Sequence, residues 1–316
     1  MHTRPLVIIS VSFIAMFATP AHPFETRVLE SVVSVLPDWS ASSRPTQGQR
    51  RGEAPEGTAV AVFKGGYLMT NDHVLGDATT ADIRLNDGRL MAVEIIGRDR
   101  RTDLALLKAP FDFPVLPLSG QQMPGDPVCA IGNQFGLGLS VTCGVISATH
   151  RAGTGFNAVE DFIQTDATVN PGGSGGALVT PTGQLAGLLS AIFTKQSDAS
   201  IGVNFATDSN LVMRIASDLR TMGRVDWGDA GLRTAPLSRV QRRKWSGLLI
   251  VQVTPDGGAE KAGLMVGDIL TKIGDRLIFR PGDDVSAVAN YRPGDRAPIW
   301  YLRDGMSKTT YLTLQK

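Results

Sequence analysis

Histidine, cysteine and aromatic side chains are scarce in this sequence of 316 residues. There are four histidines and two cysteines, and aromatic residues make up 6% of the chain. The sequence has no Cys/His spacing of the kind that holds zinc, so we expect no metal and no cofactor. With 35 glycines and so few aromatic residues, we expect many tight turns around small β-rich cores.

An excess of charge of either sign is also missing. Lys and Arg total 31 against 30 Asp and Glu, which leaves a net charge of +1. A chain so nearly neutral has no strong field to attract nucleic acid, and we expect no nucleic-acid partner. The basic run Arg239, Arg242, Arg243 and Lys244 is interpreted as a solvated linker, with steering of a peptide carboxylate as the alternative.

A hydrophobic run long enough to cross a bilayer is missing as well. The apolar run at residues 6–18 follows Arg4 and is shorter than the roughly 20 residues that a transmembrane helix needs. Thr-Pro-Ala at 19–21 offers small residues for cleavage. We therefore interpret residues 1–21 as a secretory signal peptide, with an uncleaved membrane anchor as the alternative, and expect a periplasmic or otherwise extracytoplasmic protein.

The two cysteines, Cys129 and Cys143, each lie in a strand-like run, with a glycine-rich loop between them. Outside the cytoplasm such a pair can form a cross-strand disulfide. Because the sequence does not determine the distance between the two Cα atoms, two buried free thiols remain the alternative.

Turn signals divide the chain into two compact units. Residues 24–36 have the pattern of a short amphipathic helix, and residues 40–57 are rich in Ser, Gly, Pro and Arg, which is typical of a mobile loop. From residue 58 to about 201, short β-branched runs alternate with turn residues, which predicts antiparallel barrels or sandwiches. Apolar spacing predicts a helix over residues 209–223. The second unit follows at 232–316.

One serine lies among four glycines in the segment TDATVNPGGSGGAL, residues 165–178. Serine attacks a carbonyl carbon only when a base takes its proton and hydrogen-bond donors stabilise the oxyanion. Glycines permit positive φ and let neighbouring N–H groups point at one spot. We therefore interpret Ser174 as a nucleophile in an oxyanion-hole loop of Gly172, Gly173 and Ser174, with the N–H groups of Gly172 and Ser174 as donors.

A base and an orienting acid are available elsewhere in the chain. Two of the four histidines lie in or next to the predicted signal peptide, whereas His73 directly follows an apolar strand. Asp103, at the mouth of another apolar strand, can accept the imidazole N–H and fix the tautomer. Asp72 is a weaker candidate because adjacent side chains diverge, and Asp99 lacks the position at a strand start.

Chain order separates the known serine-hydrolase scaffolds. GGSGG also satisfies the nucleophile elbow of α/β-hydrolases, but that scaffold needs a histidine after the serine, and none follows Ser174. The subtilisin order needs an aspartate before the histidine and an α/β fold, which the β-rich sequence argues against. His73, Asp103, Ser174 is the chymotrypsin order.

Five segments in this order resemble the HtrA (Deg) family of serine proteases, a branch of the trypsin-like double β-barrel proteases: TNDHV, TDLALLK, AIGNQFG, TDATVNPGGSGGAL and SNLV. The resemblance implies a trypsin-like double β-barrel with catalytic His73, Asp103 and Ser174. It also implies a homo-oligomer, a trimer by family analogy. The family usually has Asn where Gly173 stands and Pro where Ala177 stands, but neither departure removes a catalytic group.

Substrate preference is predicted from the residues around the serine. The acid that selects Lys or Arg in trypsin lies six positions before the serine, where this chain has the neutral Thr168. We expect apolar residues on the strands after the serine to form the wall of the substrate pocket. The alternative is that they belong to the barrel core. We therefore expect cleavage after small or medium aliphatic residues. The predicted pocket residues are Thr168, Leu188, Leu189, Ser190 and Ala191.

The C-terminal unit resembles a PDZ domain of the bacterial, circularly permuted type, a small α+β fold. The resemblance lies in SGLLI, AEKAGL and GDIL, between residues 246 and 270. In such a domain a peptide C-terminus adds a strand to a sheet edge while loop N–H groups hold its carboxylate. We expect the peptide beside Leu249, its carboxylate near Gly247, and a side-chain pocket at Leu248 and Ile250.

Together these features predict a mostly β, extracytoplasmic serine endopeptidase that hydrolyses misfolded or unfolded proteins and binds peptide C-termini at its PDZ domain. One alternative is a regulatory site-specific protease, with a membrane tether if residues 6–18 stay uncut. The other is a non-catalytic chaperone or PDZ adaptor. The expected division is signal peptide 1–21, N-terminal helix and loop 22–57, protease domain 58–225, linker 226–231 and PDZ domain 232–316.

Overall fold

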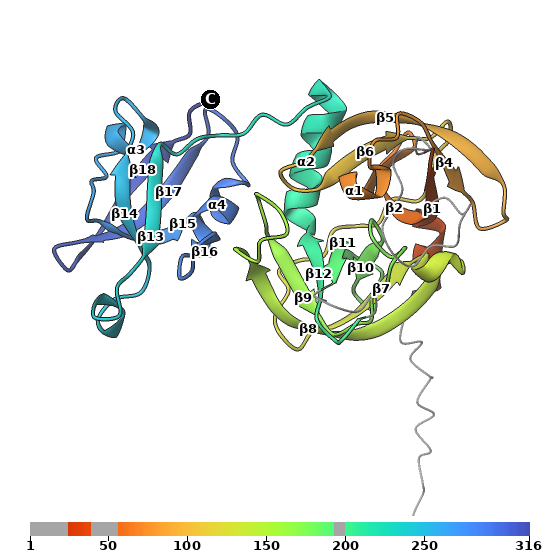
Figure 1. The fold of residues 1–316 in the computed structure, drawn as a ribbon, viewed down its shortest axis with the longest axis horizontal. Helices are drawn as coiled ribbons and strands as arrows, with labels where there is room; N and C mark the ends of the chain where they lie inside the picture. The colour runs from red at the N-terminus through yellow and green to blue at the C-terminus, as the bar shows by residue number, and fades with distance from the viewer. Residues whose placement is uncertain (1–24, 39–55, 193–199) are drawn as a thin grey trace, which may run out of the picture.

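The computed structural model describes residues 25–38, 56–192 and 200–316. These residues form two closed six-stranded barrels and a third, C-terminal sheet (Figure 1). The mostly β fold is therefore confirmed. The predicted signal peptide and nearly all of the predicted loop at 40–57 lie outside the described residues.

The first barrel closes in the order β1-β2-β3-β6-β5-β4. Its buried aliphatic side chains, among them Leu68, Ile83 and Leu107, fill the interior. The strands are β1 (Val32–Pro37), β2 (Gly57–Phe63), β3 (Tyr67–Thr70), β4 (Ala81–Arg84), β5 (Leu90–Asp99) and β6 (Leu104–Lys108).

The N-terminal segment differs from the expected helix over residues 24–36. A short 3-10 helix, η1 (Thr26–Ser31), is followed directly by β1, which pairs with β2 and β4. The valines of β1 are β-branched, so they lose little freedom in a strand and pack well on a sheet. The helix prediction is wrong from Val32 onward, and the first barrel begins before the predicted domain start at residue 58.

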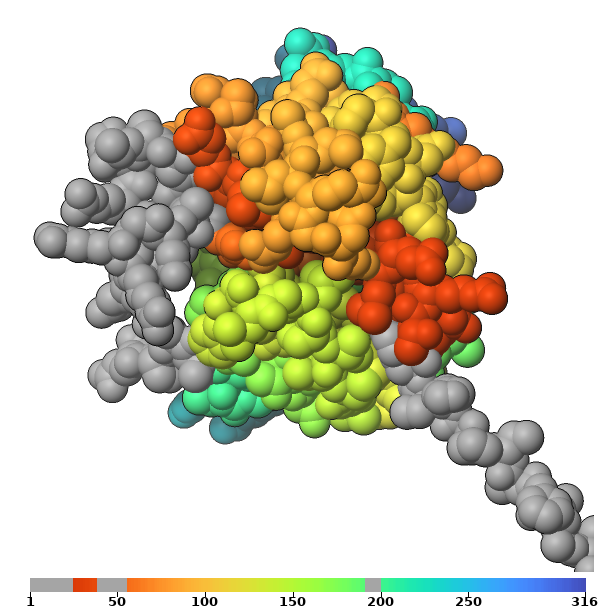
Figure 2. Space-filling view, turned by 90° about the vertical axis from the view of Figure 1, so that its right-hand side faces the viewer, coloured from red at the N-terminus to blue at the C-terminus, as the bar shows by residue number. Residues whose placement is uncertain are grey.

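The second barrel closes in the order β10-β11-β12-β9-β8-β7. The predicted helix after it is confirmed as α2 (Ser209–Met222), whose apolar face packs against strands of both barrels. Figure 2 shows residues of the first barrel, orange and yellow, resting on yellow-green residues of the second. The strands are β7 (Pro127–Gly132), β8 (Ser140–Arg151), β9 (Phe162–Thr165), β10 (Ala177–Val179), β11 (Leu185–Ile192) and β12 (Asn204–Asp208).

The C-terminal sheet has the order β13-β14-β15-β17-β18, with β16 paired to β15. Short helices α3 (Gly258–Lys261) and α4 (Asp283–Val288) accompany it. The strands are β13 (Leu232–Pro236), β14 (Leu248–Val253), β15 (Ile269–Ile273), β16 (Arg276–Leu277), β17 (Arg296–Arg303) and β18 (Met306–Thr313). The remaining short helices are α1 (Asp72–Leu75), η2 (Gln134–Gly136) and η3 (Gln241–Arg243).

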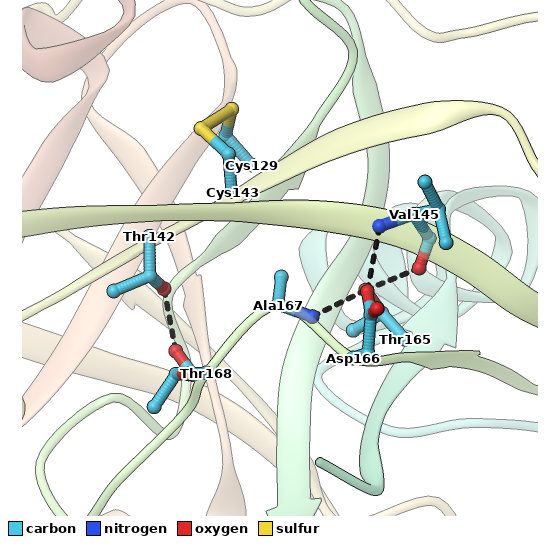
Figure 3. The surroundings of a disulfide bond; sticks show 8 residues. All are labelled: Cys129, Thr142, Cys143, Val145, Thr165, Asp166, Ala167 and Thr168. Carbon is cyan, nitrogen blue, oxygen red and sulfur yellow. Dashed lines mark hydrogen bonds between the residues drawn. A yellow bond between two sulfur atoms is a disulfide. The ribbon is translucent and has the colours of Figure 1, made fainter.

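Cys129 and Cys143 are directly paired residues of β7 and β8, with their Cα atoms 4.0 Å apart, and they form a disulfide (Figure 3). The structure therefore favours the bridge over two free thiols. Among the helices of the described ranges, none has the length and apolar character needed to cross a membrane.

Candidate active site

Asp103 holds His73 in one orientation. The side-chain Oδ2 of Asp103 lies 2.6 Å from the ring Nδ1 of His73, and Oδ1 accepts the backbone N–H of His73 at 2.8 Å. A carboxylate at Nδ1 favours the tautomer that carries its proton there, which leaves Nε2 free to accept a proton. The histidine can therefore act as a base at Nε2.

The first barrel brings these two residues together. Strands β3 and β6 are paired, with Thr70 opposite Ala105, so their ends lie side by side. His73 follows β3 in the single turn of α1, and Asp103 precedes β6 with a left-handed φ of 59°. The Asn71 side chain and the Asp72 N–H both donate to the Asp103 carbonyl, at 2.9 and 3.2 Å, and brace this turn.

Asp72 has a different partner. Its Oδ1 accepts from Arg98 at 3.2 Å. Burial raises the pKa of Asp72, and the neighbouring Arg98 guanidinium partly offsets that rise. Asp72 is therefore engaged by Arg98. This agrees with the prediction that Asp103 is the acid that orients the imidazole of His73.

Glycines shape the loop that carries Ser174. Gly172 has φ +91°, and a Cβ at this position would lie 2.2 Å from the Asn133 carbonyl oxygen. Thr58 of the first barrel donates its N–H to the Ser174 carbonyl at 2.9 Å and its hydroxyl to the Gly172 carbonyl at 2.7 Å. The loop is thus held against β2 and has no room for a side chain at Gly172.

Two N–H groups of this loop are free to bind an anion. In the described part of the chain, neither Gly172 nor Ser174 has an acceptor for its N–H. Pro171 accepts from the Phe135 N–H at 2.6 Å, and because C=O and N–H of a trans peptide point in opposite directions, the Gly172 N–H points away from Phe135. The Gly173 N–H between them is occupied, because it donates to the Asn170 carbonyl at 2.9 Å, so the two free N–H groups are the two predicted donors.

His73, Asp103 and Ser174 line one cavity of about 520 Å³, within the usual range for ligand sites. The Ser174 hydroxyl donates to the Ser190 carbonyl at 3.4 Å, and within the described ranges it makes no hydrogen bond to His73. The Ser174 hydroxyl must therefore exchange this hydrogen bond for one to Nε2 of His73 before the histidine can take its proton. The other lining residues are Arg100, Phe156, Asn157, Val169, Asn170, Pro171 and Ser190.

Most of the predicted substrate pocket is wrong. Leu188 and Leu189 are fully buried and belong to two different core clusters, because both faces of β11 are covered. Thr168 is exposed but lies outside the cavity lining, and its carbonyl accepts the Thr142 hydroxyl at 2.5 Å (Figure 3). Ser190 does line the cavity. The side chain of Ala191 lies outside the described residues.

The walls of the cavity come from segments that the prediction did not use. Val169, Asn170 and Pro171 immediately precede the glycine loop, and that proximity to Ser174 was a signal available in the sequence. Phe156 and Asn157 lie in the loop between β8 and β9, and nothing in the sequence indicates that this loop lies near Ser174. Asp166 is absent from the lining, and its carboxylate accepts the Val145 N–H at 2.7 Å (Figure 3). No buried acid is therefore available in the described lining to select Lys or Arg beside Ser174.

The predicted peptide site at Gly247, Leu248, Leu249 and Ile250 is wrong. Strand β14 pairs with β13 on one side and with β15 on the other, so no strand can be added beside Leu249. Leu248 and Ile250 are buried in the core of the C-terminal unit. The unpaired edge belongs to β13, and a cavity of about 140 Å³ lies between β13 and α4. Because β13 is short and ends in Pro236, its sequence does not predict a strand with a free edge.

Known proteins share both halves of this architecture. Residues 57–188 match the trypsin-like peptidase domain family, and residues 199–314 match the PDZ domain family. Serine endoprotease DegS of Escherichia coli (strain K12) is 35% identical over 271 residues, which cover 82% of this chain and 76% of DegS. Periplasmic serine endoprotease DegP of the same strain is 35% identical over 260 residues, 79% of this chain and 55% of DegP.

Solved structures agree with these relatives. The HtrA-type protease AlgW, in a complex with a tripeptide, has a TM-score of 0.71 and 34% identity, covering 92% of this chain and 95% of AlgW. The identity exceeds 30% over most of this chain and most of DegS and of AlgW. The chain therefore belongs to the HtrA (Deg) family of serine endoproteases, with a trypsin-like protease domain followed by a PDZ domain.

Proposed function

We propose that this endopeptidase acts outside the cytoplasm on unfolded or misfolded polypeptides, and that its catalytic residues are His73, Asp103 and Ser174. The observation that carries the proposal is that these three residues, from two barrels, line one cavity, with Asp103 hydrogen-bonded to His73. The disulfide and the periplasmic relative DegP support the location.

The reaction that we propose for these side chains begins once the Ser174 hydroxyl has exchanged the Ser190 carbonyl for His73. His73 takes the Ser174 proton at Nε2 while its Nδ1–H is held by Asp103, and the Ser174 oxygen bonds to the scissile carbonyl carbon. The N–H groups of Gly172 and Ser174 bind the oxyanion that forms. The imidazolium then protonates the leaving amine, and a water molecule, activated by the same histidine, hydrolyses the acyl-enzyme.

The cavity walls support a preference for aliphatic side chains before the cleaved bond. Pro171 and Phe156 present apolar surface near Ser174, whereas Arg100 is the charged side chain of the lining besides the His73–Asp103 pair. A substrate Lys or Arg would meet Arg100 without an acid to pair with. Faster cleavage of peptides with Arg than with Val at this position would contradict the preference.

Labelling with a fluorophosphonate, which reacts with activated serines, tests the catalytic assignment, with Ser174→Ala as the control. Hydrolysis of an unfolded model protein, measured with and without a hydrophobic C-terminal peptide, tests the substrate class. A folded sample without label would favour the non-catalytic adaptor, and a single cleavage in one partner protein would favour the regulatory protease. The trimer remains a prediction, which the mass of the assembly in solution tests.

A further inference from the structure

The cavity beside β13 is walled by both domains. Leu232, Val285 and Val288 contribute apolar surface from the C-terminal unit, while Arg101 and Val159 come from the barrels. Its volume of about 140 Å³ matches the roughly 150 Å³ of an apolar cavity that holds a benzene-sized group. One aliphatic side chain of a ligand fits this space.

Backbone groups around the cavity suit a peptide C-terminus. Strand β13 has one unpaired edge, which can accept an added strand. In the loop before β13, the N–H groups of Gly228 and Ala230 have no acceptor among the described residues, whereas Asp229 donates to Gln315 at 2.7 Å. Free N–H groups at the end of an open strand edge can hold a carboxylate.

Two acidic side chains line the cavity, so a ligand carboxylate needs a positive charge beside it. Asp229 and Asp284 both line it, and each accepts one hydrogen bond, from the Gly231 N–H at 2.9 Å and the Thr234 hydroxyl at 2.8 Å. Among the described lining residues, Arg101 alone carries a positive charge. Its side chain is exposed and has no ion-pair partner within the described ranges. Without Arg101, an incoming carboxylate would meet two acids.

We propose that Arg101 of the protease domain binds the terminal carboxylate of a peptide held between β13 and α4, so that the protease domain completes the PDZ site. The inference rests on the proposed binding of peptide C-termini. The Arg101 guanidinium lies 4.7 Å from the ring centre of Trp227, which opens the same loop. Packing on Trp227 therefore holds the Arg101 guanidinium next to the loop whose free N–H groups would bind the carboxylate.

This arrangement connects the ligand to the catalytic turn. Trp227 Nε1 donates to Asp99 at 3.1 Å, and Asp99 also accepts the Thr102 N–H at 3.0 Å. Arg101 lies in the same turn, two residues before Asp103, and its carbonyl accepts the Val159 N–H at 2.8 Å. A peptide bound at Arg101 therefore touches the segment that positions Asp103.

The test is binding of a fluorescent decapeptide that ends in valine, compared with its C-terminal amide, to the full chain carrying Ser174→Ala. We expect the free acid to bind about tenfold more tightly than the amide, the scale of one charge-assisted pair. Arg101→Gln should remove most of this difference by weakening the acid alone. Arg101→Lys should retain part of it, and the exposed Arg239→Gln should leave both affinities unchanged.

Equal losses for acid and amide in Arg101→Gln would overturn the proposal, because Arg101 would then act only through packing on Trp227. An unchanged preference for the acid, or no binding of either peptide, would overturn it as well. Because binding is measured without the serine, failure here is distinct from failure of hydrolysis. Fluorophosphonate labelling of the chain with Ser174 intact reports on that separately.

Discussion

The Asp103 carboxylate contacts His73 twice, at the ring nitrogen Nδ1 and at the backbone N–H, with distances of 2.6 and 2.8 Å. One contact sets the tautomer of the imidazole and the other fixes the position of its backbone. Loss of charge at this carboxyl should therefore affect chemistry far more than substrate binding.

Asp103→Asn should lower kcat by about 10⁴ with little change in KM, because an amide can favour the wrong tautomer while keeping the shape. Steady-state hydrolysis of a chromogenic peptide measures this effect, with circular dichroism as the control for folding. A loss of less than tenfold would mean that another group orients His73.

Gly172→Ala should reduce kcat/KM by about 10² to 10³, the usual effect of losing an oxyanion donor. The added Cβ would collide with the Asn133 carbonyl, so the loop must move. Gly88→Ala is the matched control, since Gly88 has a similar φ of +88° but no atom within 4 Å of its Cβ position. Similar activities in the two variants would exclude Gly172 from the oxyanion site.

Replacement of both Cys129 and Cys143 by Ala should lower the free energy of unfolding by about 3 kcal/mol, the scale for a bridge that closes a loop of roughly 15 residues. The two residues are separated by 14 positions. Urea unfolding with and without dithiothreitol measures the loss. The double variant should no longer respond to the reductant, and an equal response in both proteins would contradict the bridge.

Arg276→Gln should destabilise the contact between the two domains. Arg276 makes two hydrogen bonds to Asp161, at 2.6 and 2.7 Å, and both side chains are largely buried. Removal of one partner of such a pair costs about 3 to 5 kcal/mol. Limited proteolysis at residues 223–231 in the Ser174→Ala protein should become faster, whereas the exposed Arg280→Gln should match the parent.

Asp208→Asn should stabilise the protein at neutral pH. Burial, and then the nearby Asp161, raise the pKa of Asp208, so the folded state penalises the ionised form. Stability therefore falls as pH rises from the ordinary carboxyl value, about 4, through the raised value in the fold. Asn removes this penalty, while it can still accept the Asn210 N–H that begins α2.

The gain in Asp208→Asn should be on the order of 0.5 to 2 kcal/mol at pH 7. It should disappear below about pH 4, where Asp208 is protonated in both folded and unfolded states. Chemical denaturation at both pH values measures it. A gain of equal size at low pH would show that charge is not the cause.

Local patterns in the sequence predicted what depends on neighbours along the chain. Helix α2 follows from its apolar spacing, and the glycine loop from the need for positive φ around Ser174. The order of His73, Asp103 and Ser174 selected one scaffold among the serine hydrolases, because each scaffold places its groups in a characteristic order.

Tertiary structure alone decided which strand edges and faces are available. Val32 begins a strand because it pairs with Val60 of β2, and Leu188 is core because both faces of β11 are covered. Strand β14 cannot accept a peptide because β13 and β15 occupy its two edges. Side-chain periodicity shows that a strand has two faces, but not what covers each of them. Only the closed sheets and the packed domains provide that information.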